Sequence, residues 1–254
     1  MGDGISRKEM NKVVQDPLAW LITNFSPPAE RQPSLLTHNE VITLFHEFGH
    51  GLHHMLTRVA YPAVAGISGV PWDAVELPSQ MMENWCWQDE VLEMISGHYE
   101  SGEPLPAEKI RRLQEARNFQ AGMLLLRQLE FALFDLTIHQ ATVAIDVQKA
   151  LDEVRDQIAV FTPPAFNRFQ NSFSHIFAGG YASGYYSYSW AEVLSADAFS
   201  LFEERGIFDP DTGRSFLENI LEKGGSQDPL ELFKAFRGRE PEIDALLRHR
   251  GLAA

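Results

Sequence analysis

Two histidines spaced one helical turn apart constrain this chain more than any other feature of its sequence. His46 and His50 belong to the run HEFGH, inside a segment in which apolar residues recur at helical spacing over residues 41–56. Thr37 and Glu40 form a capping-box pattern, which predicts where this helix begins. Because residues four apart share one helix face, both imidazoles can bind the same metal ion, and zinc takes such ligands.

Two further residues of the run favour a catalytic metal site over an ordinary helix that carries two incidental histidines. Glu47 can accept a proton from a zinc-activated water, which makes it the candidate general base. Gly49 costs the helix about 1 kcal/mol relative to alanine. A destabilising residue at this point indicates that another part of the molecule approaches the helix backbone closely.

A catalytic zinc ion takes three protein ligands and keeps one open position. The best candidate for the third ligand is Glu76, at the start of the next predicted helix, which a helix–loop–helix hairpin can return to the first. Asp73 competes for that role, although its position suits a helix cap better. Glu83 shares a helix face with Glu76 and is predicted to orient a ligand imidazole, the alternative being a solvated carboxylate. His53 and His54 are predicted to be structural, because a fourth protein ligand would close the position that water needs.

The second run with chemical content is HIFAGGYASGYYSY, residues 175–188. Peptide hydrolysis needs hydrogen-bond donors for the oxyanion of its tetrahedral intermediate, and tyrosine hydroxyls and a histidine N–H can donate. Tyr185 and Tyr188 are spaced to share one helix face, and His175 precedes them. The glycines before them predict a mobile loop that closes on an extended substrate. The alternative is an aromatic packing stripe beside a flexible turn, and the zinc pattern elsewhere in the chain weighs against it.

Composition narrows the class of protein. The chain of 254 residues has 35 acidic and 21 basic side chains and a formal net charge of -14, which disfavours nucleic acid and anionic membrane surfaces as partners. Cys86 is the only cysteine, which excludes an internal disulfide and a zinc site built from cysteines. No signal-peptide core and no long apolar run is found. We therefore expect a cytoplasmic protein.

The spacing of apolar residues predicts a mainly α fold with a small β element near the N-terminus. Residues 1–16 are expected to be loop, and residues 18–25 a strand that two prolines end. Asp73 is expected to cap a helix that runs to about residue 94. Residues 107–142 are expected to form one long helix, with a kink as an option, and residues 185–204 a further helix.

Three runs together resemble the thimet oligopeptidase family of zinc metallopeptidases, and its bacterial oligopeptidase A branch in particular. They are HEFGHGLHH, DAVELPSQMMENW and FSHIFAGGYASGYYSYSW. The C-terminal run FRGREPEIDALL, with Arg237 and Arg239, is similar to that branch too. The likeness extends from about Trp20 onward. It implies a zincin-like helical catalytic domain that holds one zinc ion, and a channel that admits short peptides and excludes folded proteins.

The resemblance also implies roles for single residues. His46 and His50 match the zinc histidines of the family, Glu47 its general base, and Glu76 its third ligand. The family's substrate-closing, oxyanion-stabilising segment is matched by His175, Tyr181, Tyr185 and Tyr188.

The long helical N-terminal half of the family has no counterpart here, so residues 1–254 are expected to be a C-terminal catalytic domain. The leading interpretation is a zinc-dependent oligopeptidase that hydrolyses peptide bonds in short peptides. One alternative is an incomplete zinc- and peptide-binding fragment that needs a separate N-terminal half for activity. Another is a structural remnant that folds only with such a partner.

Overall fold

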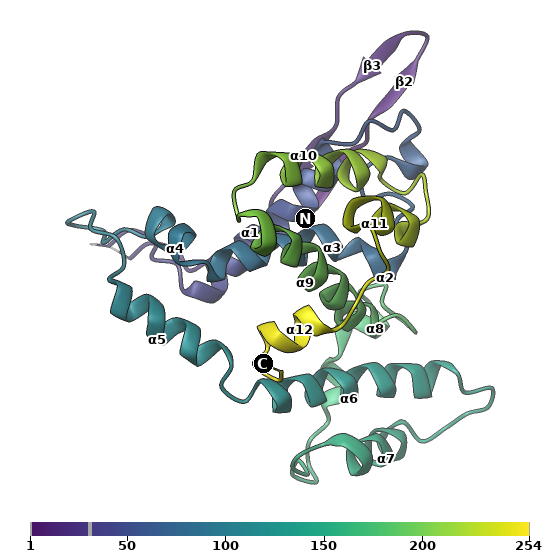
Figure 1. The fold of residues 1–254 in the computed structure, drawn as a ribbon. Helices are drawn as coiled ribbons and strands as arrows, with labels where there is room; N and C mark the ends of the chain where they lie inside the picture. The colour runs from purple at the N-terminus through teal and green to yellow at the C-terminus, as the bar shows by residue number, and fades with distance from the viewer. Residues whose placement is uncertain (1, 30–31, 254) are drawn as a thin grey trace.

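The computed structural model describes residues 2–29 and 32–253, and helices account for most of them (Figure 1). Two small two-stranded sheets lie at the N-terminal end of these residues, so the prediction of a mainly α fold with a small β element is confirmed. The strands are β1 (Gly2–Ile5), β2 (Lys8–Met10), β3 (Val13–Gln15) and β4 (Leu18–Trp20). The α-helices are α1 (His38–Met55), α2 (Trp72–Val75), α3 (Leu77–Glu83), α4 (Asp89–Ile95), α5 (Ala107–Arg117), α6 (Ala121–His139), α7 (Val147–Ile158), α8 (Ser174–Phe177), α9 (Ser187–Arg205), α10 (Pro210–Asn219), α11 (Pro229–Arg237) and α12 (Asp244–His249). Short 3-10 helices are η1 (Pro62–Val64), η2 (Asn84–Trp87), η3 (Phe169–Ser172) and η4 (Leu221–Lys223).

The strands form a narrow ribbon in which β1 pairs with β4 and β2 with β3, both antiparallel. Figure 1 shows the β2–β3 hairpin projecting from the helical body. Asn11 and Lys12 both have positive φ, as a two-residue hairpin turn of this hand requires. The expectation of loop before residue 17 is therefore wrong, and the expected strand shortens to β4. The hairpin strands β2 and β3 are almost wholly exposed, so no alternation of buried and exposed residues marked them in the sequence.

Helix α1 begins where the capping box predicts. The Thr37 hydroxyl accepts from the Glu40 N–H at 3.3 Å, and the Thr37 N–H donates to the Glu40 carboxylate at 2.7 Å. Hydrogen bonds from the backbone N–H of Thr37 and then from that of Ser26 hold the pKa of Glu40 at about 2. The carboxylate thus stays ionised at the helix N-terminus, where a negative charge is stabilising.

Helix α3 lies between α1 and α9 and contacts both. A Cβ atom added at Gly49 would lie 2.6 Å from the Pro78 carbonyl oxygen and 2.6 Å from the Cα of Ser79. The expectation that the backbone is approached closely at Gly49 is therefore confirmed, and the approaching element is the start of α3.

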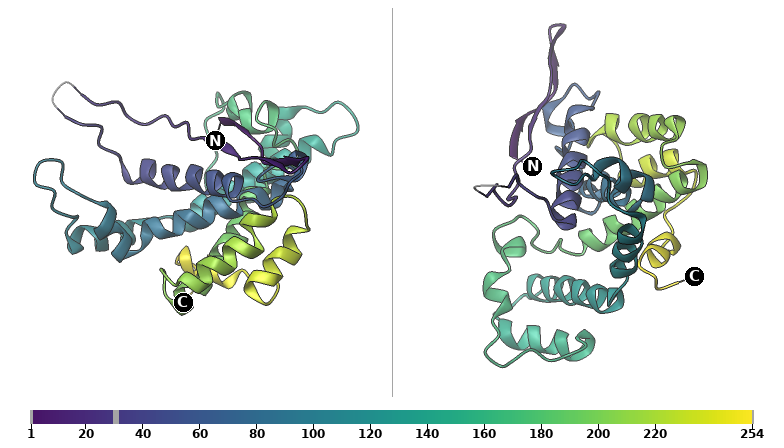
Figure 2. Two further views of the ribbon diagram at one scale, coloured as in Figure 1. Left: turned by 90° about the horizontal axis from the view of Figure 1, so that it is seen from above. Right: turned by 90° about the vertical axis from the view of Figure 1, so that its left-hand side faces the viewer.

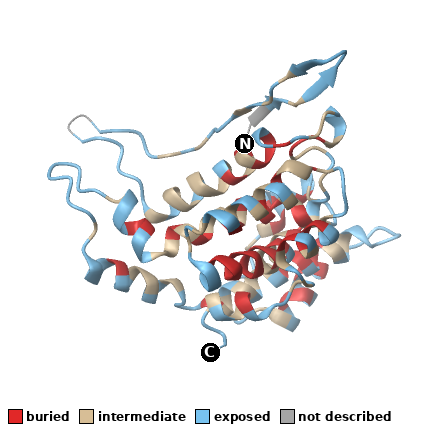
Figure 3. Cartoon of the chain, turned by 45° about the horizontal axis from the view of Figure 1, so that its top comes forward, coloured by how far each residue is buried: buried red, intermediate tan, exposed pale blue. Residues whose placement is uncertain are grey.

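The core is centred on α9, whose residues 194–202 are all buried. Figure 3 shows buried residues gathered on the central helices and exposed residues along the outer ones. One cluster joins Phe199 and Phe202 of α9 to Leu77 and Met81 of α3 and to Phe233 of α11. Glu76, the N-cap of α3, is thus attached to the best-packed part of the molecule.

Two expected helices are broken in the structure. The long helix over residues 107–142 is two helices, because Gln120 adopts a left-handed conformation between α5 and α6. The helix expected from Asp73 to about residue 94 is divided into α2, α3, η2 and α4. Asp73 does not cap it, since Pro71 is the N-cap of α2. Figures 1 and 2 show α6 and α7 side by side at one end of the molecule.

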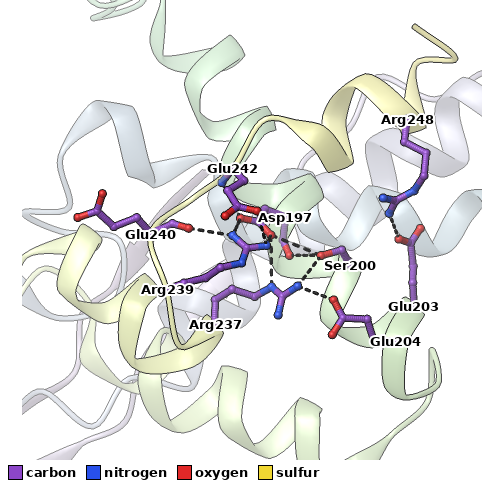
Figure 4. Close-up of polar contacts among 9 residues, drawn as sticks. All are labelled: Asp197, Ser200, Glu203, Glu204, Arg237, Arg239, Glu240, Glu242 and Arg248. Atoms are coloured by element: carbon purple, nitrogen blue, oxygen red, sulfur yellow. Dashed lines mark hydrogen bonds and ion pairs between the residues drawn. The ribbon is translucent and has the colours of Figure 1, made fainter. Parts of the chain in front are cut away.

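The two arginines of the C-terminal run have a structural explanation. Asp197 of α9 is buried and accepts two hydrogen bonds of 2.6 Å from Arg239, one to each carboxylate oxygen, and one of 3.3 Å from Arg237. The Glu242 N–H also donates to Asp197, at 2.8 Å (Figure 4). Removal of one member of a buried charge cluster costs about 3–5 kcal/mol, so these contacts anchor the chain before α12 to the core.

Among the residues that the structure describes, no helix combines the length and the apolar character that a membrane span requires.

Candidate metal centre

Helix α1 presents His46 and His50 on one face, with ring centroids 4.9 Å apart. Glu76 reaches them from the junction of α2 and α3, where it is the C-cap of one helix and the N-cap of the next. Its Oε2 lies 3.3 Å from Nε2 of His46 and 3.1 Å from Nε2 of His50. These three ligand atoms all lie within 4.8 Å of one another. Side chains that are distant in sequence therefore converge on one point.

The other metal-ligating candidates lie outside this group. Asp73 is not part of the cluster that the described residues form. His54 is buried and its Nε2 lies 2.9 Å from the Ile5 carbonyl oxygen, which ties α1 to β1. His53 is buried, and neither of its ring nitrogens has a hydrogen-bond partner among the described residues.

Surrounding hydrogen bonds fix the side chains of His46 and Glu76. His46 Nδ1 lies 2.7 Å from a carboxylate oxygen of Glu83, so its Nε2 is the nitrogen that faces Glu76. The Ser79 hydroxyl donates to Glu76 Oε2 at 2.9 Å, and the Tyr181 hydroxyl donates to Oε1 at 2.6 Å. Sequence analysis did not identify Ser79, although its position three residues after Glu76 on a helix was a usable sign.

The charges in this group keep the carboxylate ionised. Burial would raise the pKa of Glu76, but hydrogen bonding and attraction from His50, a hydrogen bond from Tyr181 and attraction from His46 outweigh it and set the pKa at about 2. Burial likewise opposes protonation of His46, and the hydrogen bond and charge of Glu83 outweigh it, so the pKa of His46 is raised. A buried carboxylate and two imidazoles drawn together this closely form a strongly polar centre.

The donor set fits a zinc ion. Ligand atoms about 2.0–2.2 Å from a tetrahedral ion lie roughly 3.3–3.5 Å apart, and the two nitrogen–oxygen separations here are close to that spacing. Two imidazoles and one carboxylate are a ligand set of catalytic zinc sites, in which a fourth position stays open. His46, His50 and Glu76 could therefore hold the ion.

Glu47 follows His46 on α1. Its negative charge helps to raise the pKa of His46 and that of Tyr188. Glu47 is not one of the three residues whose ligand atoms converge.

The structure brings the four predicted residues of the tyrosine and glycine run into one cluster. The rings of Tyr181 and Tyr188 stack with centroids 4.7 Å apart, and Tyr185 lies 5.2 Å from Tyr188. The His175 ring, at the start of α8, lies 5.8–6.3 Å from each of the three tyrosines. Tyr185 precedes α9 instead of sharing its face, but a turn before the helix still places it beside Tyr188.

The three hydroxyl groups differ in their surroundings. Tyr181 donates to Glu76, and Tyr185 donates to the Gln128 side chain at 3.1 Å. Burial raises the pKa of Tyr188 to about 12, against a hydrogen bond with Tyr181 that lowers it. All of these phenols stay protonated at neutral pH and can act as donors.

A buried carboxylate that sequence analysis missed organises this segment. Asp135 of α6 accepts from the backbone N–H groups of Ser183 and Tyr185, each at 2.9 Å, and pairs with His139 at 2.7 Å. Its position in an apolar stretch of helix was the one available sign, because ionised residues are seldom fully buried without partners. Asp135 thereby fixes the chain just before Tyr188.

Two pockets flank the centre. One of about 510 Å³ is lined by His50, Glu76, Trp72 and Tyr181 among others. The other, of about 470 Å³, is lined by Glu83, His175, Tyr185 and Tyr188 among others. Volumes of this order are typical of sites for small ligands, so an extended ligand that crossed the centre would have room on both sides.

Known peptidases match this chain over nearly its whole length. The family model of peptidase family M3 matches residues 2–252. Oligopeptidase A of Haemophilus influenzae is 60% identical over 99% of this chain, and oligopeptidase A of Escherichia coli is 59% identical over 94%. A protein of Arabidopsis thaliana named probable cytosolic oligopeptidase A is 51% identical over 95%. The matched regions are 38%, 36% and 35% of these three relatives, so the chain spans little more than a third of their length.

Proposed function

The chain belongs to peptidase family M3, and from that premise we propose that it is a zinc-dependent oligopeptidase that hydrolyses peptide bonds in short peptides. The observation that carries the proposal is the convergence of His46, His50 and Glu76, whose ligand atoms lie within 4.8 Å of one another. One zinc ion per chain would occupy this group. When bound there, zinc would polarise the scissile carbonyl and lower the pKa of a water molecule.

Glu47 is proposed as the general base. As the water oxygen forms a bond to the carbonyl carbon, one water proton passes to the Glu47 carboxylate. When the carbon–nitrogen bond breaks, Glu47 returns that proton to the leaving amine. The products are a carboxylic acid and an amine.

The tyrosine cluster is proposed to bind the carbonyl oxygen as negative charge develops on it. Tyr188 is the leading donor, with His175, Tyr181 and Tyr185 beside it. The Tyr181 and Tyr185 hydroxyls already donate to Glu76 and Gln128, so each would have to exchange a partner before it could serve the oxyanion. Glu83 is proposed to orient His46 through the hydrogen bond to Nδ1.

We also propose that the substrates are short peptides and that the protein is cytoplasmic. Short peptides fit the two pockets that flank the centre, and the relatives are named oligopeptidases. A cytoplasmic location accords with the name of the plant relative, probable cytosolic oligopeptidase A.

A second candidate function is a zinc- and peptide-binding part that needs a separate N-terminal half for turnover. Two observations favour it: the chain spans little more than a third of its relatives, and α6 exposes large apolar side chains. Leu126, Leu129 and Leu133, whose spacing places them on one face of α6, are 36–42% exposed. An apolar face of that kind is typical of a surface that a further segment covers.

The test is Glu47→Gln, measured on a quenched fluorescent short peptide. The amide has nearly the shape of the carboxylate but cannot take the proton, so we expect kcat to fall at least about a hundredfold while zinc content stays at one per chain. A chelator should abolish wild-type activity, and added zinc should restore it. Glu93→Gln, at an exposed position of α4, is the matched control.

The outcomes separate the two candidates. A Glu47→Gln chain that keeps most of the wild-type kcat removes Glu47 from the mechanism. A wild-type chain that binds zinc and peptide but turns nothing over supports the second candidate, and activity that appears when the N-terminal half of a relative is added supports it further.

A further inference from the structure

The pocket of about 470 Å³ beside the metal centre extends well beyond the tyrosine cluster. Its lining includes Glu83, His175 and Tyr188 and also the charged residues Arg117, Glu192 and Arg250. A ligand that reached the centre through this pocket would therefore also meet these charged side chains.

The basic groups of the pocket differ in whether they have an acidic partner. Arg250 donates to both carboxylate oxygens of Glu192, and His249 lies 2.7 Å from a carboxylate oxygen of Glu203. The Arg117 side chain makes no hydrogen bond or ion pair with any residue in the described part of the chain. Its five N–H donors are therefore available to a ligand.

Arg117 is nevertheless held in place. It is the last residue of α5, and its guanidinium carbon lies 4.8 Å from the ring centroid of Trp87. Trp87 is also held by His38, whose ring packs edge-on against it with the ring centroids 4.4 Å apart. A stacked guanidinium loses little further freedom when it binds a ligand.

Burial has the largest effect on the Arg117 guanidinium. It lowers the pKa of Arg117; the charge of Glu192 opposes that shift, the charge of Arg250 adds to it, and the charges of Glu203 and Glu83 oppose it. The guanidinium is thus partly desolvated with no carboxylate in hydrogen-bond contact, and a desolvated charge is stabilised when it gains a direct partner.

We propose that Arg117 binds a carboxylate group of the peptide that occupies this pocket, and so selects among substrates. The inference rests on the proposed peptidase function. Carboxylate is the anion that a peptide supplies, and the planar guanidinium can bind it through two parallel hydrogen bonds. The carboxylate has two possible sources, the C-terminus of the peptide and an Asp or Glu side chain. Arg250 is unsuited to the role, because a ligand would have to displace Glu192.

The experiment measures binding by fluorescence anisotropy, on zinc-loaded chain carrying Glu47→Gln so that peptides stay intact. Three peptides with the same label are compared. The first has no charged side chain and ends in a free carboxylate, the second is its C-terminal amide, and the third is the amide with one internal Gln replaced by Glu. Adding Arg117→Gln should weaken the binding of a carboxylate-bearing peptide about tenfold or more, and that of the neutral amide less than about twofold. Which carboxylate-bearing peptide loses affinity identifies the source.

Two further variants control for charge and folding. Arg112→Gln changes the same residue type at an exposed position of α5 and should leave all three affinities unchanged. Arg117→Lys keeps the positive charge without the planar fork, and should fall between the parent and Arg117→Gln for the carboxylate-bearing peptide. It also carries the test if thermal unfolding shows that Arg117→Gln does not fold.

Three results would overturn the inference. Equal loss of acid and amide binding in Arg117→Gln would make Arg117 a structural support for Trp87. A parent chain that binds acid and amide alike would leave the proposed function standing without a carboxylate site. Absence of any peptide binding by the parent chain would reject the proposed function and the inference together.

Discussion

The two halves of the candidate site are held by different means. The group of His46, His50 and Glu76 is set by backbone packing, because α3 lies directly against Gly49 of α1 and Glu76 is fixed at the junction before it. The tyrosine and histidine cluster is set by stacked side chains and by the two backbone hydrogen bonds that Asp135 accepts. Residues 177–180 beside it are exposed. We therefore expect changes in the first region to alter folding and metal binding, and changes in the second region to alter the rate of hydrolysis.

The largest effect is expected from Gly49→Ala. The added Cβ would meet backbone atoms of Pro78 and Ser79 that cannot rotate away, so α3 must shift. We expect the free energy of unfolding to fall by about 2–3 kcal/mol and zinc affinity to fall with it. Chemical denaturation and a competitive zinc titration measure the two effects.

Gly180→Ala is the matched change in the other region. Its backbone has a φ of 86°, and the nearest atoms to an added Cβ belong to the Trp72 side chain at 3.4 Å. Strain of about 1–2 kcal/mol confined to the loop is expected, with zinc affinity unchanged. If both glycine variants lose zinc equally, the contrast between the two regions is wrong.

Removal of single hydroxyls tests the second region. Tyr188→Phe should lower kcat about a hundredfold with little change in KM, which is the usual effect of losing one oxyanion donor. Tyr185→Phe should lower it less than about tenfold, because that hydroxyl already donates to Gln128. Steady-state kinetics on one peptide measures both. Equal kcat for the two variants would indicate that the cluster is aromatic packing and not a donor set.

A smaller effect is expected at the hydrogen bond between Glu83 and His46. Glu83→Gln should weaken zinc binding about tenfold to a hundredfold, because the Nδ1 contact that orients the ring loses its charged acceptor. The free energy of unfolding should change by less than about 1 kcal/mol, since Glu83 is only partly buried. Unchanged zinc affinity would show that Glu83 is a bystander to the metal.

Local signals in the sequence accounted for the first region better than for the second. The capping box located the start of α1, the i,i+4 spacing paired His46 with His50, and Gly49 indicated a close approach. Glu76 was identified by residue type and by the return of the chain. Each of these signals lies within one helix or one hairpin, where geometry follows from spacing.

What sequence could not provide depends on tertiary contacts. Asp135 reaches residues 183 and 185 across a long stretch of chain, and nothing near it in the sequence announces that pairing. The left-handed Gln120 that divides α5 from α6 follows no glycine or proline, so periodicity alone predicted one long helix. That break ends α5 at the segment where Arg117 stacks on Trp87. The sequence alone therefore did not predict a carboxylate-binding site at Arg117.

The most direct test of the central claim is zinc content per chain, measured by elemental analysis of purified protein after dialysis. The wild-type chain should hold one zinc ion. His46→Ala should hold less than about a tenth of that, because one of three protein ligands is lost. His175→Ala, the same substitution in the other region, should hold as much zinc as the wild type. A His46→Ala chain that keeps stoichiometric zinc would contradict the account, and so would a His175→Ala chain that loses it.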